Sequence, residues 1–430
     1  MHIHLGQTLS IHQNPFQHGL EAAQYHRRGA IVVNAGKIVV TGEADEICAA
    51  YPQAGRTDHG NGLISPGFID AHVHFPQTAI IASWGKRLID WLETYTFPEE
   101  ARFADPAYAA EIATRFFDLS LAHGTTTTCS FATIHPASVD AFFTEARARG
   151  LRAFAGKTCM DRNAPENLRD TAQSAYDDSA ALIGRWHGLD RLQYVITPRF
   201  APTSSRAQLN ALGALWAEHP GMLMQTHLSE QTEEIRWVSE LYPEARDYLD
   251  VYESAGLAGP GALMGHAIHL TEREKAALLE RDCALVHCPT SNAFIGSGLF
   301  DMAARQAEGQ IVGLATDTGG GSSFSMLRTM ATAYEIAQLN GQALHPAQLW
   351  WLATGGSAQA LRVSDKIGRL APGFEADFIV LNLASTPAIS QRAERAEDIW
   401  EALFPTIMMG DDRAVRATYV AGIKVNGDQG

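Results

Sequence analysis

Short apolar runs alternate with helical patterns along most of the chain. Eight of these runs have the length of buried β-strands, and stretches such as 106–121, 137–149 and 206–218 between them repeat apolar residues with helical spacing. Ser204 and Ser205 can cap the last of these helices. Repeated β-then-α units predict parallel strands with crossover helices, and eight units favour a closed barrel over an open sheet. The predicted strands are 64–69, 124–131, 151–157, 192–197, 222–227, 262–266, 283–287 and 312–317.

Both ends of the chain carry β-strand patterns instead. Residues 30–40 and 416–425 each contain two β-branched runs around a glycine-containing turn, and residues 374–381 form a further strand pattern. Because both ends are rich in β-structure, we expect them to combine into one small domain. The prediction is therefore an α/β chain with a (β/α)8 TIM-type barrel over residues 66–370 and a discontinuous β-sandwich over 1–65 and 371–430.

The overall charge limits the classes of partner. Of the 430 residues, 46% are hydrophobic and 19% are charged, and the formal net charge is -15. Because phosphate groups are bound by clustered Lys and Arg, this balance disfavours nucleic acid and anionic membranes as partners. A free base or nucleoside needs no basic surface and stays possible as a small-molecule substrate.

Cysteine usage and targeting signals favour a cytoplasmic protein. The five cysteines are widely spread without a CxxC motif, which predicts buried free thiols in a reducing compartment. The first residues lack the basic and apolar segments of a signal peptide, and no apolar run is long enough to span a bilayer.

Histidines and an aspartate end four of the predicted strands. His72 and His74 follow the first, and two residues apart on a strand they point the same way. His227, His266 and Asp317 end three others. Every strand of such a barrel ends at the face where catalysis takes place, so these side chains can converge. Imidazoles with one carboxylate suit zinc or iron, which predicts one metal ion per chain.

Other histidines fit this site less well. His2 and His4 also form a His-x-His pair, but at the N-terminus we expect them to be solvent-facing strand residues. His266 is preferred to His269, which falls in the following loop. His287 ends a strand too and is expected to be a core histidine or to support the site.

Glu230 is the candidate proton shuttle. It lies three residues after His227, on the loop that follows the strand. A carboxyl beside a metal ligand can carry protons between water, substrate and leaving group. The alternative is a solvated loop glutamate, which the neighbouring ligand disfavours.

Several segments resemble the amidohydrolase superfamily and, within it, the guanine deaminases. The superfamily resemblance covers nearly the whole chain and lies in 66–74, the strand-ending His227 and His266, 287–292, Thr316-Asp317 and 372–380. The guanine deaminase resemblance is narrower and lies in 74–77 (His-Phe-Pro-Gln), 90–99, 198–203 and 226–230. Gln231 stands where that family usually has asparagine, a departure that leaves Glu230 unaffected.

The resemblance implies a zinc-dependent hydrolase, with iron as the other metal, that deaminates guanine to xanthine and ammonia in purine catabolism and forms a homodimer. It implies metal ligands His72, His74, His227 and Asp317, substrate contacts Gln77, Arg199, Phe200, Glu230 and His266, and catalytic roles for Glu230, His266 and Asp317. An arginine has only donors, which fit the O6 and N7 acceptors of guanine and repel the amine of adenine.

Three alternatives are weighed against this interpretation. A pterin deaminase would meet the same 2-amino-oxo pattern with the same arginine. A triazine-type hydrolase has a similar metal core, but the Pro-Arg-Phe and His-Phe-Pro-Gln segments disfavour it. A non-enzymatic scaffold would have lost metal ligands, and none is lost here.

Overall fold

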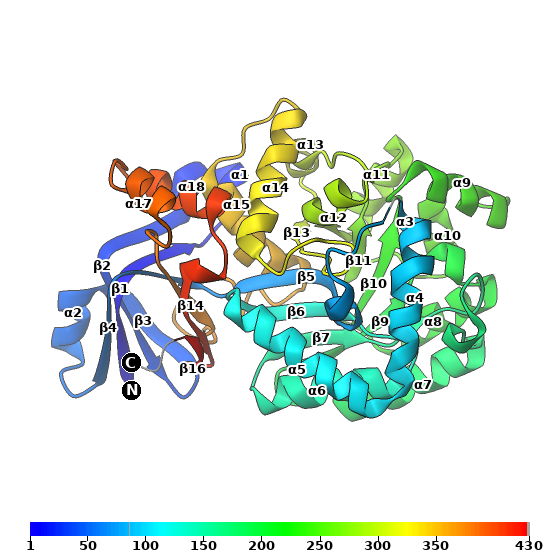
Figure 1. The fold of residues 1–430 in the computed structure, drawn as a ribbon, viewed down its shortest axis with the longest axis horizontal. Coiled ribbons are helices and arrows are strands. Elements are labelled where there is room, and N and C mark those ends of the chain that lie inside the picture. Colours follow the sequence, from blue (N-terminus) through cyan, green and yellow to red (C-terminus); the bar gives the residue numbers. More distant parts are fainter. Residues whose placement is uncertain (86, 428–430) are drawn as a thin grey trace.

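The fold consists of a parallel barrel and a second sheet made by both ends of the chain. The computed structural model describes residues 1–85 and 87–427, and its two sheets share no strand. In Figure 1 the second sheet lies at the left and the barrel at the right, with helices around the outside of the barrel. This arrangement confirms the predicted α/β barrel with a β-rich unit from both termini.

Eight strands form the barrel wall, and in chain order each pairs in parallel with the next. They are β5 (Phe68–His74), β6 (Thr125–Phe131), β7 (Arg152–Gly156), β9 (Leu192–Pro198), β10 (Leu223–Leu228), β11 (Ala262–His266), β12 (Ala284–His287) and β13 (Val312–Leu314). A short additional strand, β8 (Thr158–Cys159), pairs with β9. Buried side chains of these strands fill the interior, among them Phe154, Val195 and Leu223.

The wall closes between β5 and the segment that follows β13. The amide of Asp317 donates to the carbonyl of His72 at 3.0 Å. The amide of His74 donates to the carbonyl of Thr318 at 3.3 Å. The barrel is therefore continuous at the level of the candidate metal ligands.

The first barrel strand begins later than the sequence pattern predicts. The run 64–69 is divided between two sheets, because β4 (Gly55–Pro66) belongs to the terminal sheet and β5 starts at Phe68. Gly67 is the residue between the two strands. A Cβ there would lie 2.2 Å from the hydroxyl oxygen of Thr126, so only glycine fits. Periodicity cannot detect this division, since both strands are buried and apolar. His72 and His74 thus lie within β5 instead of after it.

The predicted helices are present with small shifts at their ends. They are α5 (Pro106–Ala122), α6 (Pro136–Ala148) and α8 (Arg206–Glu218). Ser205 caps α8, where its hydroxyl accepts from the Gln208 amide at 3.2 Å. The other helices that follow barrel strands are α7 (Ala172–Trp186), α9 (Thr232–Leu241), α10 (Tyr248–Ser254), α11 (Glu272–Glu280), α12 (Pro289–Phe294), α13 (Met302–Ala307), α14 (Met326–Leu339), α15 (Pro346–Trp351) and α16 (Ser357–Ala360). Two short helices, α3 (Leu88–Trp91) and α4 (Phe97–Ala101), follow β5.

The terminal sheet has seven strands in the order β16-β15-β14-β4-β1-β2-β3. Its other strands are β1 (His2–Ile11), β2 (Ala23–Asn34), β3 (Lys37–Glu43), β14 (Phe378–Leu381), β15 (Val415–Val420) and β16 (Ile423–Gly427). The terminal segments also contain the helices α1 (Pro15–His18), α2 (Ala44–Ala50), α17 (Pro387–Ala393) and α18 (Ile399–Met409); α2 packs on β2 and β3, and α18 packs on α14. Both predicted hairpins are present, as β2–β3 and β15–β16. The strands are paired into one mixed sheet, in which β4 pairs with both β1 and β14, and the expected β-sandwich layering stays a prediction. The domain limits 65/66 and 370/371 stay predictions.

His4 is buried, so the expectation that His2 and His4 both face solvent is wrong. Only 3% of His4 is exposed, and its ring packs edge-on against Phe378 and Tyr419. The cause is that both faces of β1 are covered: Phe378 and Tyr419 lie against His4, and residues of α2 pack against the other face. His2, near the end of the strand, is partly exposed and bonds to Thr57.

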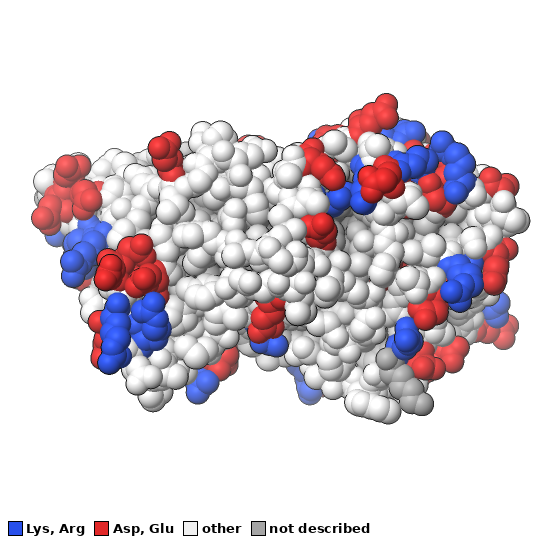
Figure 2. Space-filling view, turned by 90° about the horizontal axis from the view of Figure 1, so that it is seen from above, with Lys and Arg blue, Asp and Glu red and all other residues white. Residues whose placement is uncertain are grey.

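The remaining features concern the surface charges, the length of the helices and the state of the cysteines. Acidic and basic side chains are interspersed on the face shown in Figure 2. Among the described residues, no helix combines the length and the apolar character needed to cross a bilayer. All five cysteines are free thiols; four are buried and Cys48 is partly exposed.

Candidate active site

The predicted site residues converge at the ends of four barrel strands. His72 and His74 come from β5, His227 from β10 and His266 from β11, and Asp317 follows β13. All of them except His72 line one cavity. Its lining combines polar and apolar side chains, including His74, Gln77, Leu88, Trp91, Leu92, Arg199, Phe200, His227, Glu230, His266, Ile295 and Asp317. Every substrate contact that the resemblance implies therefore faces the same space.

The spacing of three histidines and one aspartate fits a metal ion. Nε2 of His74 lies 3.2 Å from Nε2 of His227, and Oδ1 of Asp317 lies 3.5 Å from Nε2 of both His72 and His74. Tetrahedral zinc ligands about 2.0–2.1 Å from the metal are about 3.3 Å apart, which matches these separations. Nε2 of His72 is buried without a hydrogen-bond partner among the described residues, as expected of an atom reserved for a ligand.

The protonation of these groups also suits metal binding. Burial lowers the pKa of His72, His74 and His227, so the three rings are neutral, as metal ligands must be. Nδ1 of His227 donates to the carbonyl of Arg199 at 2.7 Å, which leaves Nε2 without its proton. Burial would raise the pKa of Asp317, but the nearby imidazoles of His72, His266 and His74 hold that pKa below its usual value.

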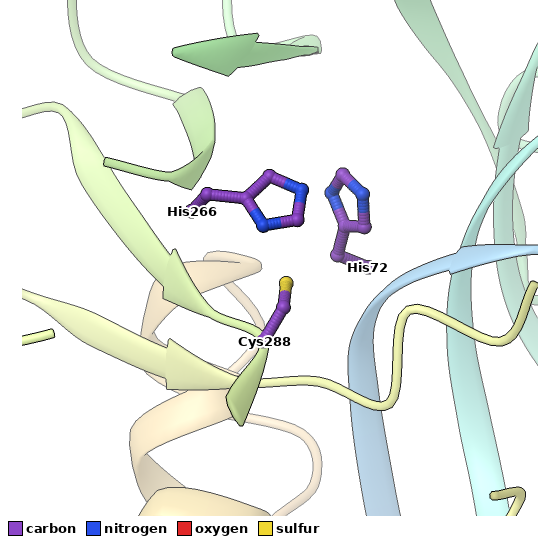
Figure 3. Close-up of side chains that lie close together, drawn as sticks. All are labelled: His72, His266 and Cys288. Atoms are coloured by element: carbon purple, nitrogen blue, oxygen red, sulfur yellow. The ribbon is translucent and has the colours of Figure 1, made fainter. Parts of the chain in front are cut away.

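A second group of possible ligands contains Cys288, which sequence reasoning did not single out. Its Sγ, a nitrogen of His72 and a nitrogen of His266 lie within 4.8 Å of one another. Figure 3 shows the sulfur beneath the two rings. Burial raises the pKa of the Cys288 thiol well above its ordinary value, and this group brings no carboxylate. The set with Asp317 is therefore the better metal site.

His266 and Asp317 are held in an uncommon backbone conformation. Their φ angles are 63° and 48°, in the left-handed region that non-glycine residues rarely occupy. Such conformations persist where surrounding structure fixes them, and they occur often at functional sites. Nδ1 of His266 bonds to Oδ1 of Asn292 at 2.8 Å, which turns Nε2 toward Asp317 and Glu230.

Glu230 is buried beside His266, so the alternative of a solvated loop glutamate is excluded. Only 2% of Glu230 is exposed, and its Oε2 lies 3.6 Å from Nε2 of His266. Ser297 donates to its Oε1 at 2.7 Å. Burial raises the pKa of Glu230, and the two carboxylates Glu230 and Asp317 raise that of His266 against the effect of burial. The carboxyl can therefore hold a proton at higher pH than an exposed glutamate.

Several residues of the site were not predicted from the sequence. Asn292 and Ser297 orient His266 and Glu230, and Glu100 contacts both Gln77 and Arg199. Asn292 lies in a segment that carries the superfamily resemblance, and Glu100 directly follows the segment 90–99. Ser297 lies outside every segment of the resemblance, so it offered no signal.

The two remaining histidines lie beside the site. Nε2 of His269 bonds to the carbonyl of Ser297 at 2.7 Å, in the loop after β11 where it was predicted. His287 is buried and stacks on Phe300, and burial lowers its pKa to about 3. His287 is thus a core histidine, as expected.

Comparison with known proteins places the chain in one family. Residues 63–425 match the amidohydrolase family. The chain belongs to the amidohydrolase family. This amidohydrolase is 42% identical over 402 residues to guanine deaminase of Escherichia coli K12, covering 93% of this chain and 92% of that protein.

Solved structures agree with this assignment. A structure of E. coli guanine deaminase matches this amidohydrolase with a TM-score of 0.97 at 39% identity, covering 99% of this chain and 100% of that one. Guanine deaminase from C. acetobutylicum, solved with guanine bound in its active site, matches with a TM-score of 0.89 at 29% identity and 99% coverage of both chains.

Proposed function

We propose that this amidohydrolase hydrolyses guanine to xanthine and ammonia. The observation that carries the proposal is one cavity that joins the metal-ligand set to Glu230 on one side and to Arg199 on another. The similar proteins named guanine deaminase support the same substrate.

The metal is proposed to be zinc, held by His72, His74, His227 and Asp317. Bound zinc would make hydroxide available near neutral pH, where water alone is too weak a nucleophile for the guanine C2 atom. Three histidines with one carboxylate also suit iron. Metal analysis of the purified protein distinguishes the two.

Glu230 is proposed to move the protons. Because its pKa is raised, its carboxyl can protonate the ring nitrogen next to C2, so that negative charge does not build up on the purine. The same group can then accept the remaining proton of the attacking water and pass it to the departing amine, and the proton held by Asp317 restores the acid form of Glu230. His266, fixed by Asn292, donates toward the oxygen that develops at C2, and Asp317 accepts a proton from the attacking water.

Arg199 and Phe200 are proposed to select and hold the base. The guanidinium offers only donors, which suit the O6 acceptor of guanine and not the amine of adenine. Phe200 is 4% exposed on the cavity wall, where its ring can pack on the purine. With Trp91, Leu88 and Leu92 it also keeps bulk water from the reacting atoms.

The test is ammonia release from guanine, adenine and pterin. Guanine is expected to exceed adenine by about 10⁴–10⁵ in kcat/KM, because a mismatched base leaves buried polar groups unpaired. Arg199→Ala should lower guanine turnover severely and narrow that ratio while the metal content stays unchanged. Equal rates on guanine and adenine would refute the purine assignment. A wide preference for pterin would mean that the substrate is a pterin and not guanine, and it would leave the proposed mechanism unchanged.

The assembly and the compartment are proposed from the family resemblance and from the cysteines. A homodimer follows from the family resemblance, and cytoplasmic location is supported by five free thiols, which a reducing compartment preserves. Sedimentation of the purified protein tests the first, and cell fractionation tests the second.

A further inference from the structure

Glu100 is a fully buried carboxylate that holds two polar residues of the cavity. It lies on α4, and its exposure is 0%. Nη1 of Arg199 donates to both of its oxygens, at 3.0 and 2.8 Å, and Nε2 of Gln77 donates to Oε1 at 2.9 Å. Neither the metal site nor the proton transfer described above uses this group.

The carboxylate decides which end of the Gln77 amide faces the cavity side. A carboxylate only accepts hydrogen bonds, so the NH2 group of Gln77 must point toward Glu100 and its Oε1 must point away. Oε1 is buried and has no hydrogen-bond partner among the described residues. It lies against Gly319, where a Cβ would come within 1.8 Å of it and where φ is +121°. Glu100 therefore fixes the Gln77 amide in an orientation that leaves its acceptor, Oε1, without a hydrogen bond.

Glu100 also fixes the neighbouring donor. The pair with Arg199 is buried on both sides, with side-chain exposures of 4% and 1%, and it balances the charge of the guanidinium. One amino group of Arg199 is bound to Glu100, and the guanidinium carries further N–H donors. Because one carboxylate binds both residues, Gln77 and Arg199 lie next to each other, and both belong to the lining of the cavity.

We propose that Glu100 is a positioning residue that gives the cavity an acceptor–donor pair selective for a lactam edge. In a 6-oxopurine the N1–H donor lies beside the C6=O acceptor, so Gln77 Oε1 would receive N1–H while Arg199 donates to O6. The inference rests on the proposed function and names the part of the base that is recognised. Glu100 itself does not touch the substrate. It acts by fixing the orientation of Gln77 and Arg199, which do.

Hypoxanthine and 6-methoxypurine are the probes. Both lack the 2-amino group that is hydrolysed, so their dissociation constants report recognition alone, by calorimetry on the metal-loaded enzyme. Hypoxanthine keeps the lactam edge, whereas in 6-methoxypurine N1 is an acceptor that would oppose Gln77 Oε1. The wild-type protein is expected to prefer hypoxanthine.

Glu100→Gln is the main variant. An amide at position 100 directs its NH2 group at Gln77, so the Gln77 amide turns and offers a donor to the cavity. Hypoxanthine binding is expected to weaken by about 10- to 100-fold, the usual effect of an unpaired buried group. The preference over 6-methoxypurine should shrink, and the KM for guanine should rise more than kcat falls.

Two further variants separate positioning from folding. Combining Glu100→Gln with Gln77→Glu exchanges carboxylate and amide, which restores an acceptor beside Arg199 and should recover most of the preference. Glu99→Gln is the matched control, because Glu99 bonds to Tyr108 and Arg102 and does not line the cavity. It should leave the preference unchanged.

The outcomes are distinct. Unchanged hypoxanthine preference in Glu100→Gln, or no recovery in the double variant, overturns the positioning role even if guanine is deaminated. Absence of hypoxanthine binding to the wild-type protein overturns the lactam selection. Binding with the expected preference but without ammonia release from guanine leaves the role of Glu100 supported and refutes the proposed function alone.

Discussion

Replacing Arg191 by methionine is expected to lower the free energy of unfolding by about 3 kcal/mol, because it leaves a buried carboxylate without its cation. Nη1 of Arg191, the residue before β9, donates to both oxygens of Asp377 at 3.0 Å and to Glu375 at 2.7 Å. The Asp377 side chain, which lies beside the terminal sheet, is only 2% exposed. This cation therefore joins the barrel to the terminal sheet.

The size of the expected loss in free energy of unfolding follows from the interactions that the two carboxylates keep in the variant. Breaking a buried ion pair costs about 3–5 kcal/mol when one charge is left alone. Here Glu375 keeps its pair with Arg152, and Asp377 keeps a hydrogen bond from the Ala421 amide at 2.7 Å. The lower end of the range therefore applies.

The loss should depend on pH. Burial raises the pKa of Asp377, and Arg191 opposes that rise, so the variant should raise it further. A carboxyl whose folded-state pKa exceeds its unfolded value stabilises the fold when protonated, and that stability is lost as pH rises through the folded pKa. The deficit of Arg191→Met should thus be smaller at about pH 5 than at about pH 8.

Urea unfolding followed by fluorescence measures the effect at both pH values. Adding Asp377→Asn should recover part of the loss, because no buried charge is then left unpaired. Arg147→Met is the control: it removes a surface pair with Asp190, both more than half exposed, and should cost less than about 1 kcal/mol. A loss from Arg191→Met no larger than the control, or equal at both pH values, would refute the reasoning.

Three other predictions concern the site and the buried histidine. Glu230→Gln keeps the shape but cannot cycle a proton, so guanine turnover should fall by at least about 10²-fold with metal retained; near-normal turnover would exclude the shuttle. His74→Ala should lose most of the bound metal, measured by atomic emission, whereas His2→Ala should keep it. Burial lowers the pKa of His4 to about 3, so stability should fall by up to about 1.4 kcal/mol per pH unit as pH drops from about 6.5 toward that value. His4→Phe removes this dependence and should move the acid-unfolding midpoint, followed by circular dichroism, to lower pH; an unchanged midpoint would contradict the assignment.

The sequence was most informative where one property determines the position of a residue. Repeated apolar runs predicted the barrel strands, because parallel strands covered on both faces are apolar throughout. Polar residues at the ends of such runs, like His227 and Asp317, could be predicted to converge because all parallel strands end on one face. The division at Gly67 could not be predicted, since it depends on how close Thr126 comes in space.

Contacts between distant segments account for what the sequence missed. A glutamate on a short helix, such as Glu100, is expected to face solvent. Its burial depends on Gln77 and Arg199, which come from two other segments and bind it. His4 was placed wrongly because the residues that cover it, Phe378 and Tyr419, come from the other end of the chain. The periodicity of a sequence predicts which residues share a face of a helix or strand. It does not predict which other segments pack against that face, because this depends on the tertiary fold.

The closure of the barrel has a thermodynamic consequence. The residues whose backbones join the first strand to the last, His72, His74 and Asp317, are the same ones whose side chains are proposed to bind the ion. Ion binding and ring closure are then linked equilibria: each tenfold excess of ion over its dissociation constant adds about 1.4 kcal/mol to the closed state. A substitution that leaves this junction mostly open weakens ion binding by the free energy needed to close it again, even when every ligand is intact. We expect the amide of Asp317 to exchange hydrogen faster after chelation than amides in the middle of the wall, such as that of Val195.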